Sequence, residues 1–118
     1  MDAFDNCAKL SSVTFGKNVK YIEQGAFSNC NAFTEFVIPD GVLWFDNYAF
    51  SGCRTLTKIT IPKTVTDIGS YAFRHCKELK TIIFEGTVAE WRAIKKGYEW
   101  KIDLKDCTVQ CSDGISQQ

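Results

Sequence analysis

Four cysteines recur at a fixed distance along the chain, and this spacing is the strongest constraint on how the chain folds. Cys7, Cys30, Cys53 and Cys76 are each 23 residues apart. Each follows an Ala-Phe pair at the same offset, and each precedes a Leu or Phe by three residues. Seven columns of apolar or Cys residues keep this frame. The chain is therefore expected to consist of stacked copies of one short unit, which buries the columns as ladders.

The segment that begins three residues after each of these cysteines has the pattern of a β-strand. In the fourth copy, Leu79-x-x-Ile82-x-Phe84 alternates so that Ile82 and Phe84 are expected to face inward. Pro39 and Pro62 follow two of these segments and end them, because proline cannot donate to a sheet. Each repeat is then one strand, a turn, a short extended Val-x-x-Ile piece and a tight Ala-Phe-x-x-Cys corner. The period matches that of leucine-rich repeats.

The alternative interpretation is an α/β chain with a βα unit of the same length. Such βαβ units need about 30 residues or more, and no ten-residue helical period separates the strands here. The predicted fold is therefore a β-rich solenoid of leucine-rich repeat coils, with one strand per repeat, short corner turns and a C-terminal cap of helix plus strand. Residues 1–86 form about four coils, the first truncated, and residues 87–118 form the capping segment of the same domain.

The capping segment is expected to begin with a helix. Thr87 and Glu90 have the spacing of a capping box. Apolar residues then recur at helical spacing, and Gly97 offers a stop. Trp91 falls in the column of Ile68, so the chain is expected to start a fifth coil and convert it to a helix there.

The two ends of the chain are expected to differ. Trp100 and the strand-like residues 107–111 complete the cap, whereas the polar residues 112–118 are expected to fray. The first coil begins at its corner, and its strand has no cap. An open strand edge pairs readily with another chain, so self-association through residues 10–16 is predicted, with a disordered or crystal-packed end as the alternative.

Charge and composition argue against several classes of protein. Fourteen Lys+Arg balance fourteen Asp+Glu, so the basic excess of a nucleic-acid binder is missing. The apolar runs are far shorter than the ~20 residues of a membrane helix, and residues 1–15 lack the features of a signal peptide. We expect no nucleic-acid partner, no membrane insertion, and any targeting sequence to lie outside this chain.

The cysteines are expected to be buried thiols rather than metal ligands or bridges. No Cys-x-x-Cys pair occurs. Equivalent positions of stacked strands lie ~4.8 Å apart, but their parallel side chains fit the disulfide torsion poorly. The four repeat cysteines are therefore expected to pack as small hydrophobes. Cys107 and Cys111 lie too far apart on a strand to bridge each other, and their redox state stays open.

The sequence contains no recognisable catalytic motif. His75 is the single histidine, and it stands beside Cys76 at a corner where adjacent side chains point apart. It is expected to be a solvated residue rather than a catalytic base. No glycine-rich phosphate-binding loop, nucleophile elbow or zinc-binding His-Glu-x-x-His motif appears. The acidic residues form no close pair suited to acid–base catalysis. We expect no enzyme activity, no metal and no cofactor.

One known family resembles the whole repeat frame. The fourth copy reads Ile68-Gly69-x-Tyr71-Ala72-Phe73-x-x-Cys76-x-x-Leu79-x-x-Ile82, and it resembles the BspA-type leucine-rich repeats of surface proteins in bacteria and some protists. The resemblance covers residues 2–86. It implies a non-enzymatic protein-interaction or adhesion module of a cell-surface or secreted protein, with a protein or a glycan as its ligand. The alternative is a structural spacer without a ligand of its own.

Outward aromatic residues are the candidate ligand-binding residues. Tyr21 and Trp44 occupy one column beside the Val-x-x-Ile piece, and Tyr48 and Tyr71 stand at the following corner. Exposed aromatics with a polar rim are the usual anchors of a recognition surface. Core packing does not require Trp44. The alternative is that its ring only covers the flank of the solenoid by folding over Leu43 or Tyr21.

A charged pair on the strand face is the second candidate. Glu35 and Lys58 are neighbours in the outward column of the main strands. They are expected to pair with each other, at under ~1 kcal/mol if exposed. If a ligand does not depend on the aromatic residues, it is expected to bind on this face.

Overall fold

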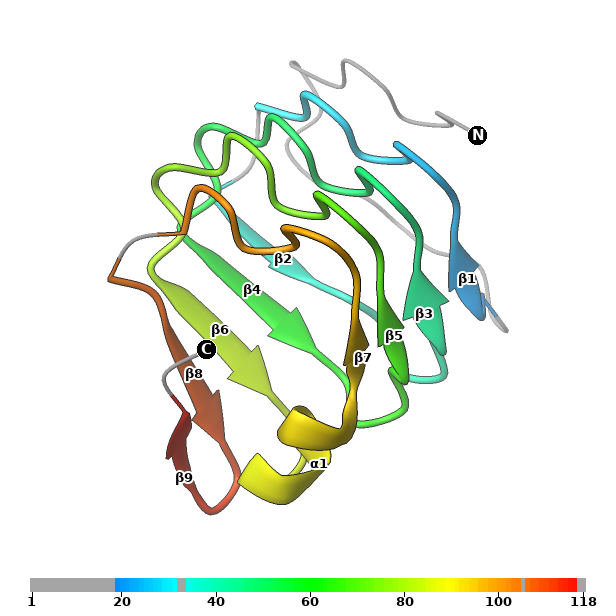
Figure 1. Ribbon diagram of the computed structural model, residues 1–118, viewed down its shortest axis with the longest axis vertical. Helices are drawn as coiled ribbons and strands as arrows, with labels where there is room; N and C mark the ends of the chain where they lie inside the picture. The colour runs from blue at the N-terminus through cyan, green and yellow to red at the C-terminus, as the bar shows by residue number, and fades with distance from the viewer. Residues whose placement is uncertain (1–18, 32–33, 105, 117–118) are drawn as a thin grey trace.

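Two β-sheets run along a stack of coils, and most of their strands pair in parallel (Figure 1). The computed structural model describes residues 19–31, 34–104 and 106–116. The predicted burial of Cys7 and the predicted self-association through residues 10–16 lie outside the described residues. The predicted solenoid is confirmed.

Each coil contributes one longer strand to the first sheet, which we call the long-strand sheet. Its strands are β2 (Glu35–Val37), β4 (Lys58–Ile61), β6 (Thr81–Phe84), β8 (Thr108–Cys111) and β9 (Gly114–Ser116), in that order. Neighbouring parallel strands pair residues one repeat apart, as Phe36, Ile59 and Ile82 do. Ile82 and Phe84 are buried, as predicted. Each such side chain contributes about 1.5–3 kcal/mol when fully buried.

The extended Val-x-x-Ile piece of each repeat forms a second, short strand. These strands make the short-strand sheet, with the order β1 (Tyr21–Ile22), β3 (Trp44–Phe45), β5 (Asp67–Ile68) and β7 (Lys95–Lys96). The second residue of β1, β3 and β5 is buried, whereas the first points outward. The apolar columns of both sheets face each other across the coil, so the core is a continuous ladder.

The corner of each repeat is built on two backbone positions in the left-handed region. Gly25, Tyr48 and Tyr71 hold the first, with φ of 66°, 60° and 54°. Four residues later the same region recurs, at Asn29, Gly52 and His75. The corner amides then point at the next coil, where the N–H of Tyr48 donates to the carbonyl oxygen of Ser70.

The repeat cysteines are buried inside this corner. Cys30, Cys53 and Cys76 have no exposed surface, which confirms the predicted burial. The thiol of Cys53 donates to the carbonyl oxygen of Phe27 over 3.2 Å, and that of Cys76 donates to Phe50 over 3.0 Å. The neighbouring Cys76 thiol and burial hold the pKa of Cys53 far above its ordinary value. A cysteine therefore suits the column because it is small, largely apolar and a weak donor.

A short helix, α1 (Val88–Ala93), follows β6 and covers the end of the core. The predicted capping box is present: the N–H of Glu90 donates to Thr87 Oγ1, and the N–H of Thr87 donates to Glu90 Oε1. The expectation that Gly97 stops the helix is wrong, because the helix ends at Ala93. Gly97 instead packs on the preceding coil, where a Cβ would lie 2.4 Å from the backbone nitrogen of Ser70.

The placement of Trp91 in the column of Ile68 is also wrong. Ile68 pairs with Lys96 of β7. The helix inserts extra residues before the fifth coil resumes, so partners in β5 and β7 are 28 residues apart, whereas partners in β3 and β5 are 23 apart. Trp91 is buried from the helix side, with its ring 5.8 Å from that of Trp100.

The last residues do not fray as expected within the described part of the chain. β8 forms as predicted, but residues 114–116 form β9, which pairs antiparallel with it. Two bonds fix the turn between them: the N–H of Ser112 donates to the carbonyl of Gly86, and that of Val88 donates to Asp113 Oδ1. Polar residues are ordered here because their hydrogen bonds are satisfied. The proposed division of the domain at residue 86 stays a prediction.

Candidate functional site

The predicted aromatic pair lies on the outer face of the short-strand sheet. Tyr21 and Trp44 are partners in the register of β1 and β3. Their ring centroids are 4.7 Å apart, at an interplanar angle of 31°. Tyr21 is 48% exposed, and Trp44 is half-buried. The indole therefore rests on Tyr21, as the flank-covering interpretation expects, and it also borders open space on its other side.

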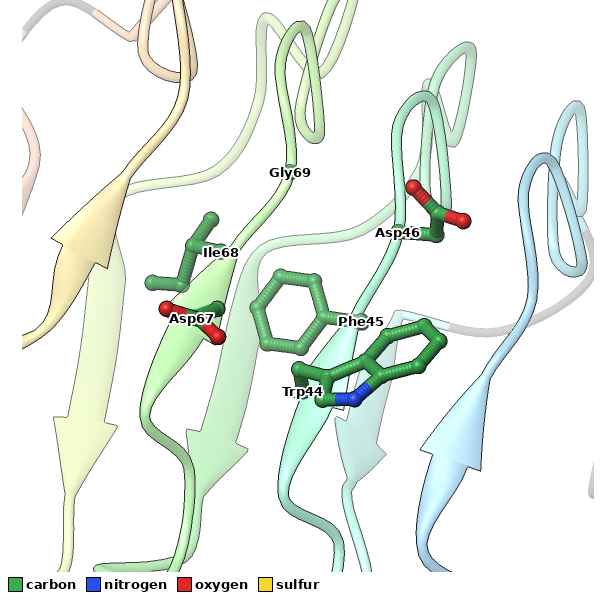
Figure 2. Close-up of a pocket in the computed structure, with 6 residues that line it drawn as sticks. All are labelled: Trp44, Phe45, Asp46, Asp67, Ile68 and Gly69. Atoms are coloured by element: carbon green, nitrogen blue, oxygen red, sulfur yellow. The ribbon is translucent and has the colours of Figure 1, made fainter.

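That open space is a groove between β3 and β5, shown in Figure 2, with a volume of about 270 Å³. Its lining residues are Trp44, Phe45, Asp46, Asp67, Ile68 and Gly69. A Cβ on Gly69 would lie 2.3 Å from the carbonyl carbon of Asp46, so no side chain fits there. Gly69 therefore allows the two coils to approach closely at this end of the groove.

Two aspartates, one from each side of the groove, are among its lining residues. Asp67 is the register partner of Trp44, and Asp46 follows Trp44 by two residues. Asp46 Oδ1 accepts a hydrogen bond from the N–H of Asn47, and Asp67 Oδ2 accepts a long one of 3.5 Å from the Thr66 hydroxyl. Within residues 19–31, 34–104 and 106–116, neither carboxylate has an ion-pair partner. Sequence reasoning missed both residues as a site, although Asp67 stands one repeat after Trp44 and Asp46 follows Trp44 by two residues.

The predicted corner tyrosines form a row with a third tyrosine. Tyr48 and Tyr71 stack with centroids 5.3 Å apart, and Tyr98 meets Tyr71 edge-on at 5.7 Å. Partial desolvation and the neighbouring Tyr98 and Tyr48 rings raise the pKa of Tyr71. The guanidinium of Arg74 lies 5.7 Å from the Tyr71 ring centroid. Sequence reasoning missed Tyr98, which is 70% exposed, because the α1 insertion moves it out of the 23-residue frame.

The predicted Glu35–Lys58 pair is confirmed on the long-strand sheet. The two residues are partners in the β2–β4 register, and Lys58 Nζ lies 3.9 Å from Glu35 Oε1. Both side chains are exposed, at 40% for Lys58 and 63% for Glu35. An exposed pair of this kind contributes under ~1 kcal/mol. The structure therefore does not bring all six predicted residues together: the aromatic residues lie along the short-strand side, and the charged pair lies on the other sheet.

His75 and Cys76 do not form a reactive pair. The thiol of Cys76 points inward to the Phe50 carbonyl. His75 Nδ1 lies 3.7 Å from Asp103 Oδ2, with a partly exposed side chain. Among the described residues, no group of three His, Cys, Asp or Glu side chains is placed to hold a metal ion. The same part of the chain contains no helix with the length and apolar character needed to cross a membrane.

The sequence of this chain matches the model of a known repeat family. The model of a family described as "BspA type Leucine rich repeat region (6 copies)" matches residues 1–97. The chain belongs to this family. The BspA-type resemblance predicted for residues 2–86 is thereby confirmed and extends into α1 and β7. A BspA-type chain is a repeat module, whose coils stack to present a long surface.

Solved structures include a similar leucine-rich protein. A leucine rich cell surface protein from Faecalibacterium prausnitzii A2-165 is 33% identical over 79% of this chain, with a TM-score of 0.76. The matched part is 24% of that protein's chain, so this chain spans about a quarter of its length.

A second solved structure aligns far less closely. It is a leucine-rich repeat protein from Bacteroides ovatus ATCC 8483, aligned over 94% of this chain and 51% of its own. Its identity is 17% and its TM-score 0.31, which is too low to indicate the same arrangement of coils. No match was found among curated proteins.

Proposed function

We propose that this BspA-type module is a non-enzymatic interaction or adhesion module of a cell-surface or secreted protein, and that its protein or glycan ligand binds along the short-strand side. The observation that carries the proposal is the position of Trp44. Its indole borders a groove of about 270 Å³. The same column holds Tyr21, Asp67 and Lys95 in the neighbouring strands, so the fold does not require an indole there.

The same column distinguishes recognition from a spacer role. A spacer is expected to carry interchangeable polar residues at every outward position. The outward residues of β1, β3, β5 and β7 are instead Tyr, Trp, Asp and Lys. Tyr48, Tyr71 and Tyr98 add a row of rings at the corner. Large, rigid aromatic side chains are typical anchors of protein and ligand contacts, which favours recognition.

Localisation and chemistry support the same proposal. A similar solved structure is named as a cell surface protein. Among the described residues, the buried Cys76 thiol and the partly exposed His75 do not converge on a common cleft. A surface that binds without converting its ligand is the function that this arrangement supports best.

The experiment begins with the folded chain applied to arrays of matrix proteins and glycans. For any ligand found, Trp44→Ala is expected to weaken binding at least tenfold (~1.4 kcal/mol). Val37→Ala is the matched control, because Val37 is an exposed apolar residue on the long-strand sheet. Its affinity is expected to equal that of the wild type.

Two results would contradict the proposal in different ways. Unchanged affinity in Trp44→Ala, with loss in Glu35→Ala, would place the site on the long-strand sheet. A folded chain that binds nothing on either array would instead favour the spacer role. A melting temperature unchanged by Trp44→Ala is required in each case, because it shows that the variant is folded.

A further inference from the structure

We propose that the groove between β3 and β5 receives an arginine side chain from a basic segment of a partner protein. This inference rests on the proposed function and names the chemistry of its ligand. The groove combines one indole with two carboxylates, Asp46 and Asp67 (Figure 2).

The geometry of the groove suits a guanidinium group. Trp44 and Asp67 are register partners on adjacent strands, which lie ~4.8 Å apart. A guanidinium is planar and can stack on an indole while its N–H groups donate to a carboxylate. Lysine offers only a compact point charge and no planar fork. A guanidinium in the groove would thus have an aromatic ring and a carboxylate among its lining groups.

Charge favours a cation over a neutral ligand. Asp46 and Asp67 have no ion-pair partner in the part of the chain that the structure describes. Lys95 is the register neighbour of Asp67 on the side away from Trp44, yet the two form no ion pair. A sugar could stack on the indole and donate hydroxyl groups to the carboxylates, but it carries no positive charge to pair with theirs. A positive side chain compensates them and is attracted over about 8–10 Å in physiological salt.

The size of the groove is sufficient for a single side chain. Pockets for drug-sized molecules begin at about 300 Å³, and this groove is slightly smaller, at about 270 Å³. Gly69 packs on the backbone of Asp46 and Asn47 and closes one end of this space. The rest of the partner would then contact the exposed Tyr21 next to Trp44.

The test uses the folded chain labelled with ¹⁵N and three capped pentapeptides. Each peptide has glycine and serine around one central residue, which is arginine, lysine or the uncharged isostere citrulline. The indole N–H signal of Trp44 is assigned from its loss in Trp44→Phe. The arginine peptide is expected to shift this signal with an affinity at least fivefold above that of the citrulline peptide. The shift is expected to weaken as salt is raised.

Matched carboxylate variants locate the contact. Asp67→Asn and Asp46→Asn are each expected to weaken the binding of the arginine peptide at least threefold. Asp40→Asn makes the same change of charge on an exposed turn outside the groove and is expected to bind as the wild type does. Thermal unfolding of each variant checks that it is folded.

Equal binding of the citrulline peptide, an unmoved Trp44 signal, or full affinity in both Asp67→Asn and Asp46→Asn would overturn the arginine assignment. A neutral oligosaccharide that moves the Trp44 signal where the arginine peptide does not would assign the groove to a glycan. Each of these results would contradict the arginine assignment without contradicting the proposed function. That function fails separately, if binding of an array ligand survives Trp44→Ala.

Discussion

The backbone N–H of His75 donates to the side-chain oxygen Oδ2 of Asp103 over 2.6 Å. The equivalent corner amides of Asn29 and Gly52 donate instead to backbone carbonyls of the next coil, those of Ser51 and Arg74. The coil that follows His75 is longer, with equivalent positions 28 residues apart. A carboxylate thus takes over the role of a backbone carbonyl at the joint between the regular and the expanded coil.

Removing that carboxylate is expected to destabilise the joint. Asp103→Ala leaves the His75 N–H without its acceptor and is expected to lower the free energy of unfolding by about 1–3 kcal/mol. Asp103→Asn keeps an acceptor oxygen and is expected to lose less than half as much. Urea unfolding followed by tryptophan fluorescence measures both values. Equal losses in the two variants would show that charge, rather than the acceptor, matters.

Lys96 is expected to stabilise the C-terminal end of α1. Its Nζ donates to the carbonyl oxygens of Trp91 and Ile94, over 2.7 and 3.2 Å, and lies 4.6 Å from the Trp91 ring centroid. Burial lowers its pKa. Lys96→Met is expected to reduce the free energy of unfolding by about 1–2 kcal/mol, because it removes two charge-assisted hydrogen bonds and a cation–π contact.

The neighbouring lysine provides the control for this prediction. Lys95→Met changes the same residue type in the same strand, but Lys95 is exposed. It is expected to change the free energy of unfolding by less than about 0.5 kcal/mol. Chemical denaturation of the two variants side by side makes the comparison. An equal loss of unfolding free energy in both variants would contradict the role assigned to Lys96.

Thiol reactivity is expected to follow burial. In a Cys7→Ser background, Cys111 is expected to react first with a thiol reagent at pH 8, because it is only half-buried. Cys53 and Cys76 are expected to react only when the protein unfolds. Mass spectrometry of the modified peptides identifies each site. Rapid labelling of Cys53 in the folded protein would contradict the buried ladder.

Stability is expected to fall at alkaline pH, in part through Cys107. Burial raises the pKa of this thiol from 9.0 to about 11. Between these values the unfolded chain loses the proton and the folded chain keeps it, so stability is full below pH 9 and declines toward pH 11. The slope is about 1.4 kcal/mol per pH unit for one thiol. Urea unfolding at pH 8 and pH 10.5 should show a smaller decline in Cys107→Ala, and equal declines would refute the assignment.

The inner coils could be predicted because every repeat obeys the same frame. The period alone placed Cys53 and Ile82 in the core and Glu35 opposite Lys58, since stacked coils align residues one repeat apart. The fifth coil could not be predicted in this way. Its register depends on how many residues α1 takes up, and the sequence does not reveal that Lys96 rather than Trp91 continues the column of Ile68.

The candidate site was predicted in part for the same reason. Tyr21 and Trp44 share a column, so their contact followed from the repeat. The groove did not, because its lining residues come from two coils whose backbones approach closely at Gly69. Such three-dimensional proximity leaves no signal in the order of residues. Tyr98 was hidden by the same register shift that moved Lys96.

β9 pairs antiparallel with β8 and is the last strand of the long-strand sheet. A further parallel coil therefore cannot pair directly with β8 at this end of the array. An in-frame duplication of one 23-residue unit between two inner coils recreates the same neighbours above and below, so selection can accept it without new contacts. Inserting a unit between β8 and β9 would instead break their hairpin. Lineages with this architecture are thus expected to lengthen in steps of one coil, ~4.8 Å each, on the side of the array away from the hairpin. Coils added on that side would leave the groove at the same distance from the hairpin, while the far end of the array moves away from it.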